Sequence, residues 1–170
     1  MLFGPKEQYL FDCSGFLRLP LSCTADVLAA ARAELQQGGG SAQFGAVGSV
    51  VGEPAVAEAL RAVCGADYVL DRPPSLADGS SHAQLRSHGH GYADGNGAYP
   101  PTALSASLFV AVEPSSLVLV PASHKSSVPA PRRLFRGPAG SDDPFGACEA
   151  LEVQAGHAVL LCSSLLHAVR

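Results

Sequence analysis

Three side chains that can bind a metal ion lie close together in "RSHGHGYADG", residues 86–95. His88 and His90 offer neutral imidazole nitrogens, and Asp94 offers a carboxylate, within a segment of small, turn-forming residues. Two imidazoles and one carboxylate on one face of an ion are the ligand set of non-haem Fe(II) oxygenases, which leaves the remaining positions for a co-substrate and oxygen. A solvated, glycine-rich loop would have the same composition, so both interpretations stay open at this point.

A further candidate, His167, lies in "LLHAVR", residues 165–170, whose apolar pattern predicts a short strand. In a jelly roll, an early loop and a late strand can meet inside the barrel, which would bring His167 to the histidines of residues 86–95. Taken alone, the pattern is equally typical of a hydrogen-bonded histidine in a half-buried strand.

The elements that would position these residues begin with two helices. Residues 24–38 have Thr24 as a helix N-cap, good helix formers after it and glycines at the end. Residues 54–64 begin with a proline suited to the first helical turn and end before a glycine. The alternation in "GFLRLP" predicts a strand that ends at Pro20, and "DYVLD", residues 67–71, predicts another.

The second half of the chain consists of short β-rich runs separated by turn signals. They predict a mostly β fold with N-terminal helices, a double-stranded β-helix (a cupin-like jelly roll), in a single domain of residues 1–170. Residues 72–101 are rich in Gly, Pro, Ser and His and too long for a simple connector, which favours a functional, metal-binding loop. The β-rich runs are residues 103–113, 116–123, 151–154, 157–163 and 165–170.

Composition limits the classes of partner. The 170 residues are 47% hydrophobic and carry a formal net charge of −4, which argues against a nucleic-acid partner because little would neutralise the phosphates. No uncharged apolar run is long enough to span a membrane. Five cysteines without a CxxC pair favour reduced thiols over a disulfide framework, and hence the cytoplasm. We therefore expect a small-molecule substrate.

Three segments, in order, carry a resemblance to a known family: "YLFDCSGFLRLP" followed by a helix, "LVLVPASHKSSVPAP", and "LEVQAGHAVLLCSSLLHAV". They are similar to the Gly-Phe-Leu strand, the Val-Pro-Gly-Ser-His-Lys segment, and the Gly-Asp-Ala-Val strand with its iron-binding histidine in the phytanoyl-CoA dioxygenase family. The resemblance runs from about Gln8 to the last residue, and its Ser-His-Lys segment is the most specific part.

This resemblance implies a non-haem dioxygenase that uses Fe(II) and 2-oxoglutarate to hydroxylate an aliphatic small molecule. By position, His167 matches the distal iron histidine, and the proximal His-x-Asp motif falls within residues 82–95. The implied ligands are therefore His88 and His167. Asp94 or His90 would supply the third ligand.

The sequence departs from the family pattern at several positions. His90 stands where the carboxylate is usual, two residues after His88, while Ala122 replaces a glycine and His157 an aspartate. The chain also stops at Arg170, where the family continues with a strand whose arginine pairs with 2-oxoglutarate. We therefore expect a domain that is incomplete at its C-terminus, with little or no turnover. The alternative hypothesis is a non-catalytic jelly-roll module that binds a metal or small ligand.

Other polar residues have simpler interpretations. His124, after a proline-marked strand end, is predicted to be structural and to hydrogen bond to nearby backbone. His157 is predicted to be a surface or turn residue, and His82 is a further candidate for the metal site. Lys125 could face the substrate mouth, but a solvated lysine is the simpler expectation.

Overall fold

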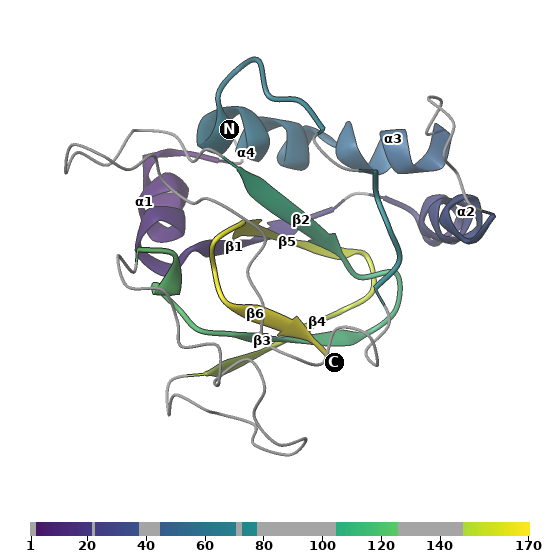
Figure 1. The fold of residues 1–170 in the computed structure, drawn as a ribbon. Coiled ribbons are helices and arrows are strands. Elements are labelled where there is room, and N and C mark those ends of the chain that lie inside the picture. Colours follow the sequence, from purple (N-terminus) through teal and green to yellow (C-terminus); the bar gives the residue numbers. More distant parts are fainter. Residues whose placement is uncertain (1–2, 22, 38–44, 71–72, 78–104, 126–147) are drawn as a thin grey trace.

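The structure, a computed structural model, describes residues 3–21, 23–37, 45–70, 73–77, 105–125 and 148–170. Its strands form two three-stranded antiparallel sheets that face each other, and helices lie over the outer side of one sheet (Figure 1). The helices are α1 (Pro5–Ser14), α2 (Ala25–Gln36), α3 (Gly45–Val51), α4 (Pro54–Cys64) and the short 3₁₀ helix η1 (Ser123–Lys125). The strands are β1 (Phe16–Pro20), β2 (Ala106–Val110), β3 (Ser115–Leu119), β4 (Glu149–Val153), β5 (His157–Cys162) and β6 (His167–Val169).

The first sheet has the order β1-β5-β2, with β5 at its centre. After its first residue β5 is continuously apolar, and every residue from Ala158 to Cys162 is buried. Such a run, without polar alternation, suits a strand that is covered on both faces. Here α4 and the second sheet provide the cover, because residues of all three share one hydrophobic cluster. Leu160 pairs with Leu17 of β1 on one side and Leu108 of β2 on the other.

The second sheet has the order β4-β3-β6. Leu117 of β3 is fully buried and lies opposite Leu151 of β4 and Val169 of β6. β4 alternates, with Leu151 and Val153 buried and Glu152 exposed. This is the pattern of an antiparallel strand that turns one face to the core and the other to solvent.

The two capped helices show why these segments are helical. In α1, the Glu7 carboxylate accepts a hydrogen bond from the Gly4 backbone N–H at 3.0 Å, and the backbone N–H groups of Glu7 and Gly4 lower the pKa of Glu7. α1 ends at Gly15, whose φ of +84° is left-handed. In α2, the Thr24 hydroxyl accepts from the Val27 N–H at 3.4 Å.

The apolar interior is divided into two clusters. The larger one fills the space between the sheets and under α4, and it includes Phe11 of α1. The smaller one joins α2 and α3 through Leu28, Ala31, Val47 and Val50. The jelly roll is therefore held by the larger cluster, while α2 and α3 form an attachment with its own contacts.

The predicted fold class is confirmed, as are the helices near 24–38 and 54–64 and the strand that ends at Pro20. The strand predicted at residues 67–71 is wrong: Tyr68, Val69 and Leu70 have no regular structure, and Val69 is 83% exposed. Residue 71 and most of the predicted loop 72–101 lie outside the described residues. Within the described ranges, no helix is both long and apolar enough to cross a membrane.

Candidate metal centre

Of the four predicted metal ligands, the structure describes His167. His88, His90 and Asp94 lie outside the described residues, as does His82. Among the residues that the structure does describe, no three or more His, Cys, Asp or Glu side chains gather so that they could hold a metal ion. The approach of His88 to His167 therefore stays a prediction.

His167 is the first residue of β6 and is 4% exposed. It lies opposite Leu119 of β3, two residues before Val169, which lies opposite Leu117. Residues directly opposite each other, or two apart on one strand, share a face of a sheet. Because Leu117, Leu119 and Val169 all belong to the cluster between the sheets, the His167 side chain shares the inner face of the jelly roll.

The ring of His167 has a defined orientation. Its Nδ1 lies 2.9 Å from the backbone carbonyl oxygen of Leu165. A carbonyl oxygen only accepts hydrogen bonds, so Nδ1 carries the proton and the neutral ring has its lone pair on Nε2. Metal-binding histidines typically donate their second ring N–H to a carbonyl or carboxylate in this way. His167 therefore fits the role of a ligand that binds through Nε2.

The turn between β5 and β6, which carries His167, is held by hydrogen bonds on both sides. Within the turn, the Leu165 N–H donates to the Cys162 carbonyl at 2.8 Å. From outside, the Ser123 hydroxyl accepts from the Leu166 N–H at 2.9 Å, and the Val120 N–H donates to the Leu166 carbonyl at 3.0 Å. Both backbone groups of the residue before His167 are thus fixed by the segment that follows β3.

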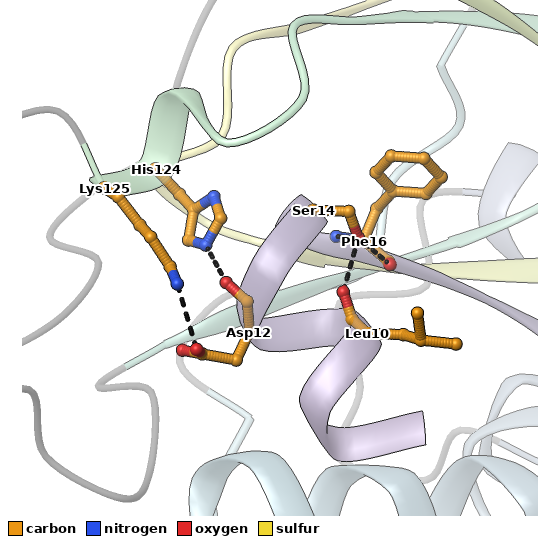
Figure 2. Close-up of polar contacts among 6 residues, drawn as sticks. All are labelled: Leu10, Asp12, Ser14, Phe16, His124 and Lys125. Atoms are coloured by element: carbon orange, nitrogen blue, oxygen red, sulfur yellow. Dashed lines mark hydrogen bonds and ion pairs between the residues drawn. The ribbon is translucent and has the colours of Figure 1, made fainter. Parts of the chain in front are cut away.

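The same segment reaches α1 through His124, as Figure 2 shows. His124 is 6% exposed, and its Nε2 donates to the Asp12 carbonyl at 2.9 Å. Its own carbonyl accepts from the Ser164 hydroxyl at 3.4 Å. Burial lowers the pKa of His124, with a smaller lowering by the Lys125 charge, against the raising effects of the Asp12 backbone and carboxylate. The prediction that His124 bonds to backbone is confirmed.

Gly15 is what allows this close approach. A Cβ at Gly15 would lie 2.4 Å from His124 Nδ1 and 2.7 Å from Leu165 Cδ1. The Gly15 carbonyl also accepts from the Cys162 N–H at 2.8 Å. Position 15 therefore lies where the end of α1 meets the His124 ring and the Leu165 side chain. Any residue other than glycine would have to displace one of these two side chains.

Lys125 and Ala122 complete the turn. Lys125 Nζ pairs with Asp12 Oδ2 at 2.9 Å, with side chains 31% and 44% exposed, so Lys125 is engaged with α1 (Figure 2). At this exposure the pair adds on the order of 1 kcal/mol or less. Ala122, at the position where the similar family has glycine, has a left-handed φ of +61°. Its N–H donates to the Ser14 carbonyl at 2.9 Å, a further link to α1.

Sequence reasoning missed the serines around the β5–β6 turn. Ser163 is 4% exposed and its Oγ lies 3.3 Å from Ser107 Oγ of β2. Ser123 accepts from the Leu166 N–H, as described above. The available signal was their position at strand ends, where serine hydroxyls commonly bond to nearby backbone. His157, as predicted, is exposed at the start of β5.

A surface cavity in the described part of the chain lies elsewhere. It has a volume of about 270 Å³ between α2 and the turn that joins β4 to β5. Cys23, Leu28, Arg32 and Gly156 are among its lining residues, and none of the lining residues belongs to β6. This cavity is therefore separate from the inner face that carries His167.

The chain is similar in structure to several solved non-haem enzymes. HygX from Streptomyces hygroscopicus, crystallised with nickel and 2-oxoglutarate, is 17% identical, with a TM-score of 0.65 over 98% of this chain and 80% of that chain. The non-heme monooxygenase ThoJ, as its nickel complex, is 17% identical, with a TM-score of 0.53 over 95% of this chain and 69% of that chain.

A third structure, the non-heme alpha ketoglutarate dependent epimerase SnoN from nogalamycin biosynthesis, is 13% identical, with a TM-score of 0.53 over 95% of this chain and 74% of that chain. No protein-family model matches the chain, and no curated protein sequence matches it either. At these identities the likeness establishes the fold. The two facing sheets form the jelly roll that the chain shares with these solved structures.

Proposed function

We propose that this chain is an Fe(II)- and 2-oxoglutarate-dependent oxygenase-type domain, similar to the phytanoyl-CoA dioxygenase family, that hydroxylates an aliphatic small molecule. The observation that carries the proposal is His167. It is a buried histidine on the inner face of a jelly roll, and its Nδ1–H donates to the Leu165 carbonyl, which leaves Nε2 as the ligand atom.

The likeness to solved structures supports the choice of metal and co-substrate. HygX has been crystallised with iron, and with nickel and 2-oxoglutarate, in the same fold. In this proposal His88 is the second ligand, and Asp94 or His90 is the third. All three lie in the segment 72–101, whose composition already favoured a functional loop.

The chain's own residues would bind the metal, hold its ligands in a fixed orientation and exclude water from the site. When bound, Fe(II) with 2-oxoglutarate and O₂ would supply the chemistry of oxidative decarboxylation coupled to hydroxylation. His167 contributes a nitrogen ligand whose ring cannot rotate without losing the bond to Leu165. The apolar inner face, with Leu117, Leu119 and Val169 beside His167, would limit the access of water.

All five cysteines are free thiols, none of them in a disulfide. Structural disulfides are rare where glutathione and thioredoxin keep thiols reduced. The free thiols support our proposal that the protein works in the cytoplasm.

Metal binding tests the proposal directly. We expect the metal-free protein to bind one Ni(II) or, under anaerobic conditions, one Fe(II), measured by calorimetry. His167→Ala should weaken binding at least tenfold, which corresponds to about 1.4 kcal/mol. The matched control is His157→Ala, because His157 is exposed at the start of β5 and should leave the affinity unchanged. Absence of binding by the unaltered protein, or an equal loss in both variants, would overturn the metal site.

The third ligand is tested in the same way. If the carboxylate is the ligand, Asp94→Ala should weaken Fe(II) binding more than His90→Ala does. The reverse order would assign the third position to His90. The two possible third ligands differ because the carboxylate of Asp94 would bring a negative charge to Fe(II), whereas the imidazole of His90 would not.

A second candidate function is a non-catalytic jelly-roll module that binds a metal or small ligand. The observation that favours it is His90, which stands at the usual carboxylate position. Succinate release with Fe(II), ascorbate and 2-oxoglutarate distinguishes the two functions. Succinate that disappears in His167→Ala supports the oxygenase, whereas metal binding without succinate supports the module.

A further inference from the structure

We infer that the Ser123–Lys125 turn positions His167: Ser123 holds the Leu166 N–H, His124 anchors the turn to α1 and to Ser164, and the Leu165–Leu166 peptide unit held in this way fixes the tautomer and orientation of the His167 ring. The first part of the inference concerns the ring alone. Its consequence for metal affinity rests on the function proposed above. His124 and Ser123 are positioning residues here, since neither is proposed to touch a metal or substrate.

The inference begins at the Leu165 carbonyl, the group that orients His167. This carbonyl accepts from His167 Nδ1 at 2.9 Å, so its direction decides where the ring points. The direction of a carbonyl is set by the peptide plane that joins it to the next residue, because that plane is rigid. The next N–H in that plane belongs to Leu166. It donates to the Ser123 hydroxyl at 2.9 Å, and this bond therefore fixes the carbonyl on the opposite side of the same peptide unit.

The Ser123–Lys125 turn is itself held in place by contacts with α1 and with the residues before His167. The His124 ring is buried and bonded to the Asp12 carbonyl at the end of α1. Its backbone carbonyl accepts from Ser164, and its ring lies against the same Gly15 position as the Leu165 side chain. Through His124 and Ser123, the turn thus connects the C-terminal end of α1 to Ser164 and Leu166, the residues on either side of Leu165.

A purely structural role would give a different distribution of contacts. One hydrogen bond from the turn to any point of β5 or β6 would suffice to join the segments. Instead, hydrogen bonds of the turn fall on Ser164 and Leu166, the two residues that flank Leu165 directly before His167. Partners of a ligating histidine that fix its tautomer commonly change metal affinity by tenfold to a hundredfold when they are removed.

The test compares serine variants by spectroscopy and by metal binding. Ser123→Ala removes the acceptor for the Leu166 N–H, and Ser123→Thr retains it. The matched control is Ser115→Ala at the start of β3, at the opposite end of that strand from Leu119, which pairs with His167; the Ser115 hydroxyl donates to the Glu113 carbonyl at 3.0 Å. The first readout is the pair of ¹⁵N shifts of the His167 ring in the metal-free protein, which report the tautomer.

For Ser123→Ala we expect a mixture of tautomers at His167 and Ni(II) binding weakened about tenfold or more. Ser123→Thr should restore the single tautomer with the proton on Nδ1, and Ser115→Ala should match the unaltered protein in both readouts. If Ser123→Ala does not fold, Ser123→Cys, whose sulfur is a weaker acceptor, should give an intermediate shift. A Ser123→Ala variant that folds with unchanged ¹⁵N shifts and unchanged affinity, or a Ser123→Cys variant with both unchanged where Ser123→Ala does not fold, would overturn the inference.

The two levels of proposal fail differently. If the unaltered protein binds no Ni(II), the proposed function is wrong, while the ¹⁵N shifts still decide whether Ser123 controls the His167 ring. If Ni(II) binds and His167→Ala abolishes binding while Ser123→Ala changes neither readout, the function stands and the positioning role is wrong.

Discussion

The two ends of the first sheet are joined to their helices in different ways. At one end, α1 meets the segment after β3 and the end of β5 through directional contacts: Asp12 to His124, Ser14 to Ala122 and Gly15 to Cys162. At the other end, α2 and α3 pack through a small apolar cluster, and an exposed ion pair at 3.0 Å joins Arg32 to Glu113. Hydrogen bonds specify geometry, whereas apolar contacts tolerate small displacements. The end with directional contacts is the one at which β5 continues into the turn that leads to His167.

The largest expected effect comes from the glycines at these two ends. Gly15→Ala should lower the free energy of unfolding by about 2–5 kcal/mol, because it combines a left-handed backbone with overlap against His124 and Leu165. Gly156→Ala, at the α2 end, has a similar φ of +80° but a Cβ position 3.6 Å from Leu28. It should show the backbone cost of about 1–2 kcal/mol less the gain of about 0.4–1 kcal/mol from the lower entropy of the unfolded chain, a net loss of roughly 0.5–1 kcal/mol. Urea unfolding of both variants measures the difference, and equal losses would contradict the close packing at Gly15.

The next effect concerns pH at the α1 end. Burial lowers the pKa of His124 in the folded protein. At a pH below the ordinary pKa of histidine, the unfolded chain therefore binds more protons at this residue than the folded chain does. Stability should therefore fall as the pH is lowered through the range below about 6.5, with a slope from this residue of at most about 1.4 kcal/mol per pH unit. The groups that face His124 are Asp12, which opposes the shift, and Lys125, which adds to it.

His124→Gln is the variant that isolates this contribution. It should lower stability at neutral pH by about 1–3 kcal/mol, because a flexible amide replaces a buried ring even where its N–H still donates to the Asp12 carbonyl, and it should flatten the pH dependence between 7.5 and 5.5, because the amide does not titrate. Thermal unfolding across that range measures both. An unchanged slope in His124→Gln would show that other groups cause the pH dependence.

A smaller, stabilising effect is expected at Ala122. At a φ of +61°, alanine destabilises the folded chain by about 1–2 kcal/mol, and glycine does not. Glycine also raises the conformational entropy of the unfolded chain, which offsets about 0.4–1 kcal/mol of this gain. Ala122→Gly should therefore stabilise the protein by about 0.5 kcal/mol. The control is Ala150→Gly in the exposed part of β4, which should destabilise by a similar amount. Chemical denaturation midpoints would reveal opposite signs for the two substitutions.

The smallest effect is expected at the α2 end. Arg32→Ala removes a pair whose side chains are 43% and 61% exposed, and it should cost no more than about 0.5 kcal/mol, declining further in high salt. Measuring the melting temperature at two salt concentrations tests this. A loss as large as that of His124→Gln would erase the difference between the two ends.

Much of the fold could be predicted because local patterns and tertiary contacts agree. β5 is apolar along its length and lies at the centre of a sheet, and α2 has both its N-cap and its stop. The predicted strand at 67–71 failed because β propensity needs a neighbouring strand, and Val69 and Leu70 have none in the described chain. α1 was missed because Tyr9 and Leu10 are exposed and Phe11 alone is buried, so no apolar stripe marks the helix.

The candidate site could be predicted in part. The order of the motifs placed His167 on a late strand of the jelly roll, and it lies at the start of β6. The prediction that His124 in the Ser-His-Lys segment bonds to backbone was also correct. The role of Ser123 could not be predicted, because its partner, the Leu166 N–H, lies far away in sequence and only the fold brings the two together. A single sequence also contains no signal for Gly15 beyond a helix stop, although the packing there requires it for a second reason.

The central place of β5 has a consequence for the order in which the molecule assembles. β1 and β2 are both made before β5, yet each pairs with β5 and not with the other: Phe16 meets Leu161, and Ser107 meets the same Leu161 from the other side. Among the described strands, β5 is the one partner of both, so a nascent chain carries β1 and β2 without this partner until β5 leaves the ribosome. Pairing across such long separations is intrinsically slow, and unpaired strand edges promote aggregation in the meantime. The sheet that supports the β5–β6 turn can close only once the segment directly before His167 has been made.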